Sequence, residues 1–130
     1  MKVPDGLRYS EEHEWVTVAD GVATIGITDY AQEELGDIVF VELPVVGATL
    51  KKGESLGVVE SVKAVSDIYV PVSGAVIEVN GRLATNPETI NEDPYGEGWM
   101  LRATLADPAE IEQLMTAEEY RGFVAEEKKE

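Results

Sequence analysis

Turn signals divide most of the chain into short segments of β-type sequence. Asp20-Gly21, Ser73-Gly74 and Asn80-Gly81 are two-residue turn sequences; the first two separate runs rich in valine, isoleucine and other β-forming residues, and the third ends such a run. Short strands bury their apolar faces only by packing against a second sheet or by closing into a barrel. The sequence therefore predicts a mainly β protein, built as a small barrel or sandwich.

The individual elements follow from local patterns. A short helix is expected over residues 30–35, with Thr28 or Asp29 as its N-cap and Gly36 as its stop. One helical turn is expected near Glu88. Strands are expected over seven segments, namely residues 14–18, 22–27, 37–43, 55–59, 67–72, 75–79 and 99–105.

The chain changes character after residue 105. Asp107, Pro108 and Glu110 have the order of a helix start with a capping box, and Thr116 with Glu119 repeats the capping pattern. Helices this short do not fold alone, so they should pack on the β body. We expect one domain over residues 1–130, with a strand-rich body at about 7–105 and a helical C-terminal segment at about 107–127.

Composition excludes several classes of function. The net charge is −16, from 26 acidic and 10 basic residues, and a negative field of this size repels nucleic acid and anionic membrane surfaces. It favours partners that have basic docking patches. The chain has no cysteine and one histidine, His13, so disulfides and Cys- or His-rich metal sites are not expected. No apolar signal segment or membrane span is evident, which predicts a cytoplasmic protein.

Lys63 has an unusual setting. Apolar, strand-like runs flank it at residues 56–59 and 68–72, so we expect it at the tip of a hairpin with its amine in solvent. Its neighbours Val62 and Ala64 are small enough to let an attached group move. An exposed amine on a fixed turn suits covalent attachment better than catalysis. We interpret Lys63 as the anchor of a swinging cofactor arm.

The segment Glu60-Ser61-Val62-Lys63-Ala64 resembles the lipoyl-attachment signature of the glycine cleavage system H proteins. The resemblance extends from about Tyr9 to Tyr120. Its other matching segments are residues 13–16, 26–32, 35–44, 71–74 and 91–99.

The resemblance implies a lipoyl/biotinyl-type barrel-sandwich hybrid with Lys63 on a β-hairpin, and a carrier rather than an enzyme. Lipoic acid would be joined to Lys63 by a lipoate-attaching enzyme. The arm would take an aminomethyl group from the pyridoxal-phosphate-dependent glycine decarboxylase (P-protein) to the tetrahydrofolate-dependent aminomethyltransferase (T-protein). Dihydrolipoamide dehydrogenase (L-protein) would then reoxidise it. The simplest form of such a shuttle is a monomer.

The loaded arm would carry a cationic amine, which a carboxylate in a nearby cleft would hold. The resemblance carries two such positions over to this chain, Glu14 and Asp67, and Glu12 could add further charge. The alternative is that both are ordinary surface acids at strand ends. We expect His13 to form a local hydrogen bond rather than act as a general base. The loop at residues 91–98 would either shape the rim of the cleft or make a tight connection.

Other carriers share the hairpin lysine. Biotin carriers usually flank it with methionines, whereas this chain has Val62 and Ala64. Lipoyl domains of 2-oxo acid dehydrogenases have an acidic residue before the lysine and continue into linkers. An H-like protein that stores or transfers lipoyl groups is not separated from a glycine cleavage shuttle by sequence. An enzyme is the weakest alternative, because no phosphate loop, nucleophile elbow or ligand cluster is present.

Overall fold

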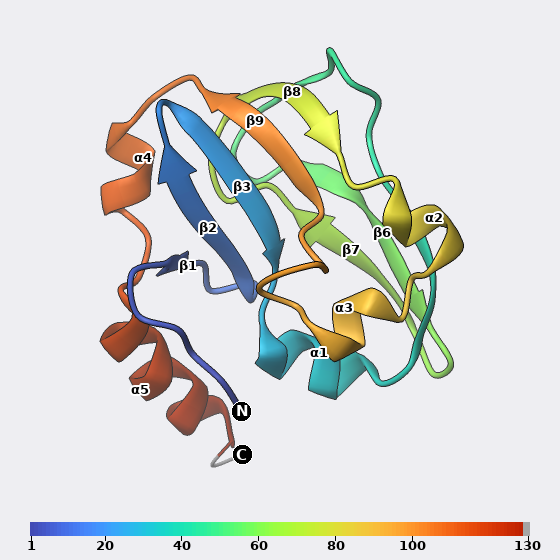
Figure 1. Cartoon of the computed structure of the whole chain (residues 1–130). Helices are drawn as coiled ribbons and strands as arrows, with labels where there is room; N and C mark the ends of the chain where they lie inside the picture. The colour runs from blue at the N-terminus through green and yellow to red at the C-terminus, as the bar shows by residue number, and fades with distance from the viewer. Residues whose placement is uncertain (129–130) are drawn as a thin grey trace.

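The computed structural model describes residues 1–128 and has two antiparallel β-sheets. Figure 1 shows them as layers of a mainly β body, which confirms the predicted fold class. The smaller sheet has the order β4 (Ile38–Glu42), β6 (Ser55–Ser61) and β7 (Val65–Tyr69). The larger sheet has the order β1 (Arg8–Tyr9), β2 (Glu14–Ala19), β3 (Val22–Ile27), β9 (Leu101–Leu105), β8 (Gly74–Val79) and β5 (Thr49–Leu50).

Residues 1–128 also form five short helices. They are α1 (Asp29–Leu35), α2 (Arg82–Thr85), α3 (Thr89–Glu92), α4 (Ala109–Glu112) and α5 (Ala117–Lys128). In Figure 1, α5 lies beside β1, and the β6–β7 hairpin projects at the same end of the molecule as α1 and α3. Among residues 1–128, no helix is long and apolar enough to cross a membrane.

Most predicted elements are confirmed, but the Lys63 hairpin differs from the prediction, and the short elements β1, β5 and α2 were not anticipated. The hairpin of β2 and β3 pairs Val18 with Ala23 across the Asp20-Gly21 turn, as expected. Strand β6 continues to Ser61 and β7 begins at Val65 instead of residue 67, so the hairpin that carries Lys63 is tighter than predicted. Strand β7 also ends at Tyr69 instead of reaching residue 72. The helix α2 follows the Asn80-Gly81 turn.

The apolar core has two parts. One lies between the sheets and includes Ile25, Val59 and Leu101, each no more than 1% exposed. The other is aromatic and holds α5 against the first strands. In it the rings of Tyr9 and Tyr120 stack with centroids 4.6 Å apart, which joins β1 to α5. The C-terminal cap therefore packs on the β body through its own small core.

Local caps explain where the helices begin. Thr28 caps α1 by accepting a hydrogen bond at Oγ1 from the Ala31 N–H. Thr116 and Glu119 form the predicted reciprocal capping box at the start of α5, with bonds of 2.9 and 3.3 Å. The predicted box at α4 is wrong, because both carboxylate oxygens of Glu110 accept hydrogen bonds from Ser73 instead.

Candidate functional site

The backbone of the Lys63 hairpin is fixed by Ser61. This side chain is 6% exposed, and its Oγ accepts hydrogen bonds from the N–H groups of Lys63 and Ala64 at 3.3 and 3.1 Å. The Ser61 N–H donates to the Ala64 carbonyl, and the Val62 N–H donates to the Asp37 carbonyl. The tip therefore has a defined backbone although its outer side chains are exposed.

Lys63 itself is exposed, as predicted. Among residues 1–128 its amine has neither a hydrogen bond nor an ion pair. Its methylene groups lie beside Gly36, where an added Cβ would be 3.4 Å from Lys63 Cε. Gly36 ends α1 with a φ of +80°, a conformation that disfavours other residues. The aliphatic part of the Lys63 side chain thus lies against the end of α1, while its amine stays accessible.

Glu14 is almost completely buried, at 1% exposed, although it begins a strand. Ser10 Oγ donates to its Oε1 at 2.5 Å, and the Tyr69 N–H donates to its Oε2 at 3.4 Å. Burial raises the pKa of this carboxyl to about 7, while the hydrogen bonds from Ser10 and Tyr69 act in the opposite direction. The interpretation of Glu14 as an ordinary surface acid is therefore wrong.

A tight turn from Ser10 to Glu14 sets the position of the Glu14 carboxyl. The Ser10 N–H donates to the Glu14 carbonyl, and the His13 N–H donates to the Ser10 carbonyl. His13 has a φ of +70°, which closes the turn. Its ring hydrogen-bonds Tyr120 at 2.8 Å and Glu127 at 3.0 Å. His13 therefore forms hydrogen bonds, as expected, but its side-chain partners lie on α5 rather than nearby in sequence.

Two pockets lie along β7. The first, of about 300 Å³, is lined by Ser10 and Glu14 together with residues 113–115. The second, of about 380 Å³, lies between α1 and β7 and is lined by Asp67 among others. Glu12 and Tyr69 line both, so the pockets adjoin.

The sequence predicted one cleft, whereas the structure has two adjoining pockets, and the two candidate acids line different ones. Asp67 is exposed, and among residues 1–128 its side chain accepts only a long hydrogen bond of 3.4 Å from Ser55. Glu14 faces the pocket farther from the hairpin, and Asp67 faces the nearer one. Glu12, which the sequence placed near the cleft as a further charge, is exposed where the pockets adjoin.

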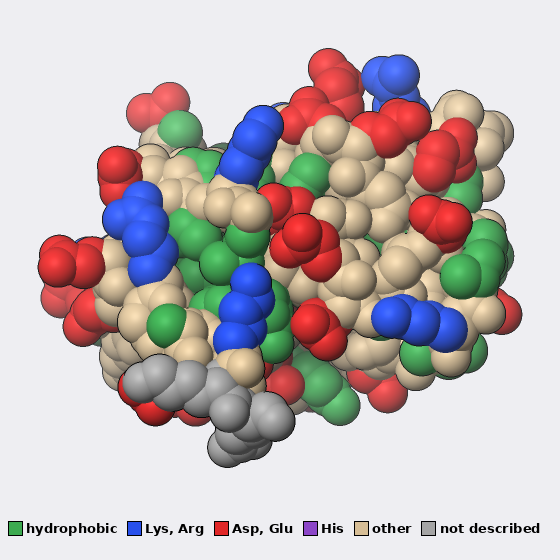
Figure 2. All heavy atoms as spheres, turned by 90° about the horizontal axis from the view of Figure 1, so that it is seen from below, with side chains coloured by type: hydrophobic (Ala, Val, Ile, Leu, Met, Phe, Trp, Pro, Cys, Tyr) green, Lys and Arg blue, Asp and Glu red, His purple; other side chains and the backbone are tan. Residues whose placement is uncertain are grey.

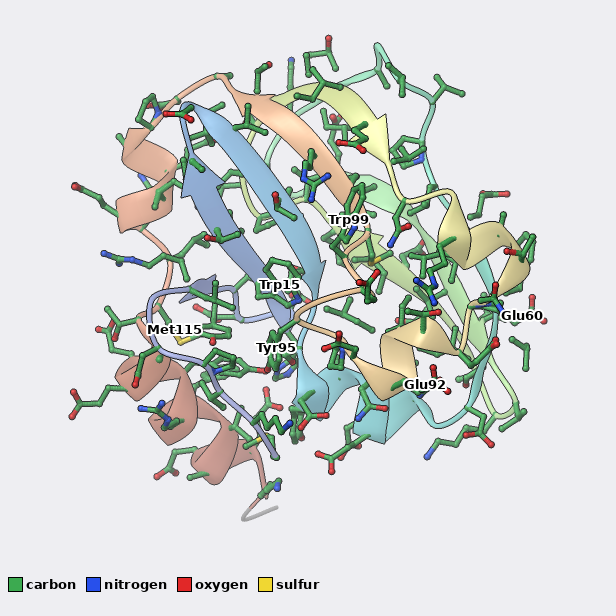
Figure 3. The ribbon with its side chains drawn as sticks, viewed as in Figure 1. Trp15, Glu60, Glu92, Tyr95, Trp99 and Met115 are labelled. Carbon is green, nitrogen blue, oxygen red and sulfur yellow. The ribbon has the colours of Figure 1, made fainter. Side chains whose placement is uncertain are left out.

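The loop at residues 91–98 holds the end of α1 in place. Asn91 Oδ1 accepts from the Ile38 N–H, and its Nδ2 donates to the Gly36 carbonyl, both at 2.9 Å. The Pro94 carbonyl accepts from Trp15 Nε1, and Figure 3 shows Tyr95 close to Trp15. The loop therefore positions the residue on which the Lys63 side chain lies.

Sequence reasoning missed three of these residues: Ser10, Tyr69 and Asn91. The partners of Tyr69 and Asn91 lie 53 to 59 positions away, so no local pattern marks them. Ser10 precedes Glu14 by four positions, which is a weak signal by itself.

The surface of the molecule that carries α1 and α5 is acidic. Figure 2 shows Asp and Glu side chains spread over the surface that carries α1 and α5, with fewer Lys and Arg. No group of carboxylates and His suited to a metal ion occurs within residues 1–128. The surface is acidic without forming an ion-binding cluster there.

Comparison with known proteins identifies the family. The family model for the glycine cleavage H-protein matches residues 7–127. Glycine cleavage system H proteins of Anaeromyxobacter sp. and Coprothermobacter proteolyticus are 56% and 58% identical over 127 residues, covering 98% and 97% of this chain and 99% and 100% of theirs. The crystal structure of the Mycobacterium marinum H protein matches with a TM-score of 0.86 at 44% identity, covering 92% of this chain and 97% of that one. The chain belongs to the glycine cleavage H-protein family.

Proposed function

We propose that this chain is the lipoylated shuttle protein of the glycine cleavage system, with lipoic acid joined by an amide to Lys63. The observation that carries the proposal is an exposed lysine whose amine has no partner among residues 1–128, on a hairpin whose backbone Ser61 fixes. Membership of the family over almost the whole chain supports the same function.

The residues around Lys63 fit the group. An enzyme that acylates the amine needs access, and the exposed Val62 and Ala64 leave the tip open. Glu60 and Ser61 complete the attachment motif, the first exposed and the second holding the turn. When bound, lipoic acid supplies reversible dithiol–disulfide chemistry. The chain has no cysteine, so no thiol of its own competes with that chemistry.

In this proposal the chain is a carrier and supplies no catalytic group. It takes the aminomethyl group from the P-protein to the T-protein, and the L-protein restores the oxidised arm. The carboxyl of Glu14 would hold the cationic amine. Burial raises its pKa to about 7, and a nearby cation would oppose that rise and favour the ionised form. Asp67 lines the pocket nearer to the hairpin and would add negative charge on the path of the arm from the hairpin to Glu14. The cytoplasmic location and the monomeric state stay predictions.

Reconstitution with the P-protein distinguishes a glycine cleavage shuttle from a protein that stores or transfers lipoyl groups. The lipoylated chain, mixed with P-protein and glycine, should support release of carbon dioxide and gain an aminomethyl group. Lys63→Arg should support neither, because a guanidinium is not acylated in the same way although its charge is kept. A lipoylated chain that never stimulates the P-protein would favour storage or transfer of lipoyl groups. Modification by a biotin ligase would favour a biotin carrier.

A further inference from the structure

Apolar side chains are exposed on the outer face of the three-stranded sheet, beside Lys63. Val39 and Phe40 on β4 are each 51% exposed, and Val62 and Val65 at the hairpin are 69% and 68% exposed. We call these four residues the hairpin patch. Large exposed apolar groups that lie together mark interaction sites more often than single ones do.

Strand register brings the patch together. Phe40 pairs with Glu60 on β6, and Glu60 pairs with Val65 on β7, so the three residues form one row across the sheet. The neighbouring row contains Val41 and Val59, which are buried at 8% and 0%. Since side chains alternate between the faces of a sheet, the row through Phe40 faces outward. An irregularity in pairing between Ile38 and Phe40 leaves Val39 exposed as well.

One carboxylate lies between the apolar residues and another lies beside them. Glu60 lies in the outward row and Glu42 lies in the next outward row, and both are exposed. Figure 3 shows Glu60 at the outer side of the molecule, away from Trp15 and Tyr95. None of the ion pairs formed within residues 1–128 involves either glutamate. A surface of this kind is complementary to an apolar surface that also carries basic groups.

We propose that the hairpin patch is the docking surface for the enzyme that acylates Lys63, and that this enzyme presents an apolar contact surface with Lys or Arg side chains facing Glu60 and Glu42. The inference rests on the proposed function, because it assumes that Lys63 is acylated. An enzyme that reaches the Lys63 amine must cover the hairpin, and the patch continues from the hairpin onto β4. A second copy of the chain fits less well, because its net charge of −16 would repel it.

Val39 and Phe40 give the cleanest test. They lie more than twenty positions before Lys63 in sequence, line neither pocket along β7 and are outside the attachment motif. The double variant Val39→Thr/Phe40→Thr keeps residues with high strand propensity at both positions. The matched control is Val45→Thr/Val46→Thr, which changes two apolar residues that are 74% and 60% exposed in the following loop.

The measurement is the initial rate of lipoylation by a lipoate ligase at several concentrations of each chain. We expect the patch variant to lose about tenfold or more in kcat/KM, mainly through KM, and the control to stay within about twofold of the parent. Equal rates for the patch variant, the control and the parent would overturn the docking proposal. A parent that is never acylated would instead overturn the proposed function, so the two failures are distinguishable.

A second variant keeps the test valid if the first one unfolds. Glu42→Lys reverses a charge at the border of the patch, and Glu112→Lys makes the same change on α4. We expect the first to slow lipoylation several-fold at low salt, with the difference shrinking at high salt because ions screen the attraction. Equal slowing by the two variants would show that only net charge matters and would reject the patch.

Discussion

Ser10 and Glu14 hydrogen-bond each other in both directions. Ser10 Oγ donates to the Glu14 carboxylate at 2.5 Å, and the Glu14 N–H donates to the same Oγ at 3.0 Å. The carboxyl is 1% exposed and borders a pocket, so its orientation is fixed before any ligand arrives. A buried carboxyl prepared in this way would interact strongly with a cation, because little water screens it.

Stability should depend on pH through Glu14. Its pKa rises from 4.5 to about 7 in the folded chain, so the native state holds the proton more tightly than the unfolded state does. This contribution to stability is fully present below about pH 4.5 and is lost as pH rises through about 7. The loss corresponds to roughly 3 kcal/mol. Glu14→Gln should remove this component, which urea unfolding at several pH values would measure.

The control for that experiment is Glu112→Gln, which changes an exposed carboxyl of the same type on α4. It should keep the pH dependence of the parent, so the general repulsion among acidic residues cancels in the comparison. A parent and a Glu14→Gln variant that lose stability in parallel between pH 5 and pH 8 would contradict the assignment.

Removing Ser10 Oγ should weaken retention of the loaded arm. The Ser10 hydrogen bond lowers the pKa of Glu14, so Ser10→Ala should raise this pKa further and leave less carboxylate at neutral pH. We expect the aminomethyl group to be lost several-fold faster at pH 7 and closer to the parent rate at pH 9, as followed by intact mass. Glu14→Ala should lose it quickly at both pH values. Equal decay of all three proteins would reject a role for this pair.

Asn91 should stabilise the end of α1, against which the Lys63 side chain lies. Asn91→Ala removes the hydrogen bonds to the Ile38 N–H and the Gly36 carbonyl, and it leaves partly buried backbone groups without their partner. The expected cost is about 1–3 kcal/mol in free energy of unfolding, measured by urea denaturation. Asn86→Ala is the control, because Asn86 is exposed and its amide donates only to Glu88. A loss as small as that of the control would show that the loop does not hold α1.

Association with partner enzymes should weaken as salt rises. The net charge of −16 attracts basic docking surfaces over distances of about 10 Å at moderate ionic strength. Stopped-flow or surface-binding measurements with the P-protein should show an on-rate that falls as sodium chloride increases. An on-rate independent of salt would mean that the acidic surface serves only solubility.

The sequence predicted the features that depend on nearby residues. The β2–β3 hairpin, the Thr28 cap of α1 and the Thr116–Glu119 capping box each join residues a few positions apart. The exposed position of Lys63 also followed from local pattern, because turn residues between two apolar strands reach the surface.

Features set by distant contacts could not be predicted. Glu110 matched a capping box, but Ser73, 37 positions earlier, takes both of its oxygens. The burial of Glu14 depends on the approach of β7 from the other sheet, which brings the Tyr69 N–H to its carboxylate. The alternating pattern of β2 shows which side chains share a face of the sheet. It does not show that β7 covers the end of the strand where Glu14 lies.

The most direct test of the central claim is the mass of the chain after treatment with lipoate and an active lipoate ligase, followed by a peptide map. We expect one lipoyl group per chain, on the peptide that contains Lys63, and no adduct in Lys63→Arg. Lys51 and Lys52, in the turn between β5 and β6 at the opposite end of β6 from Lys63, should remain unmodified. An unmodified chain, or an adduct that persists in Lys63→Arg, would contradict the account.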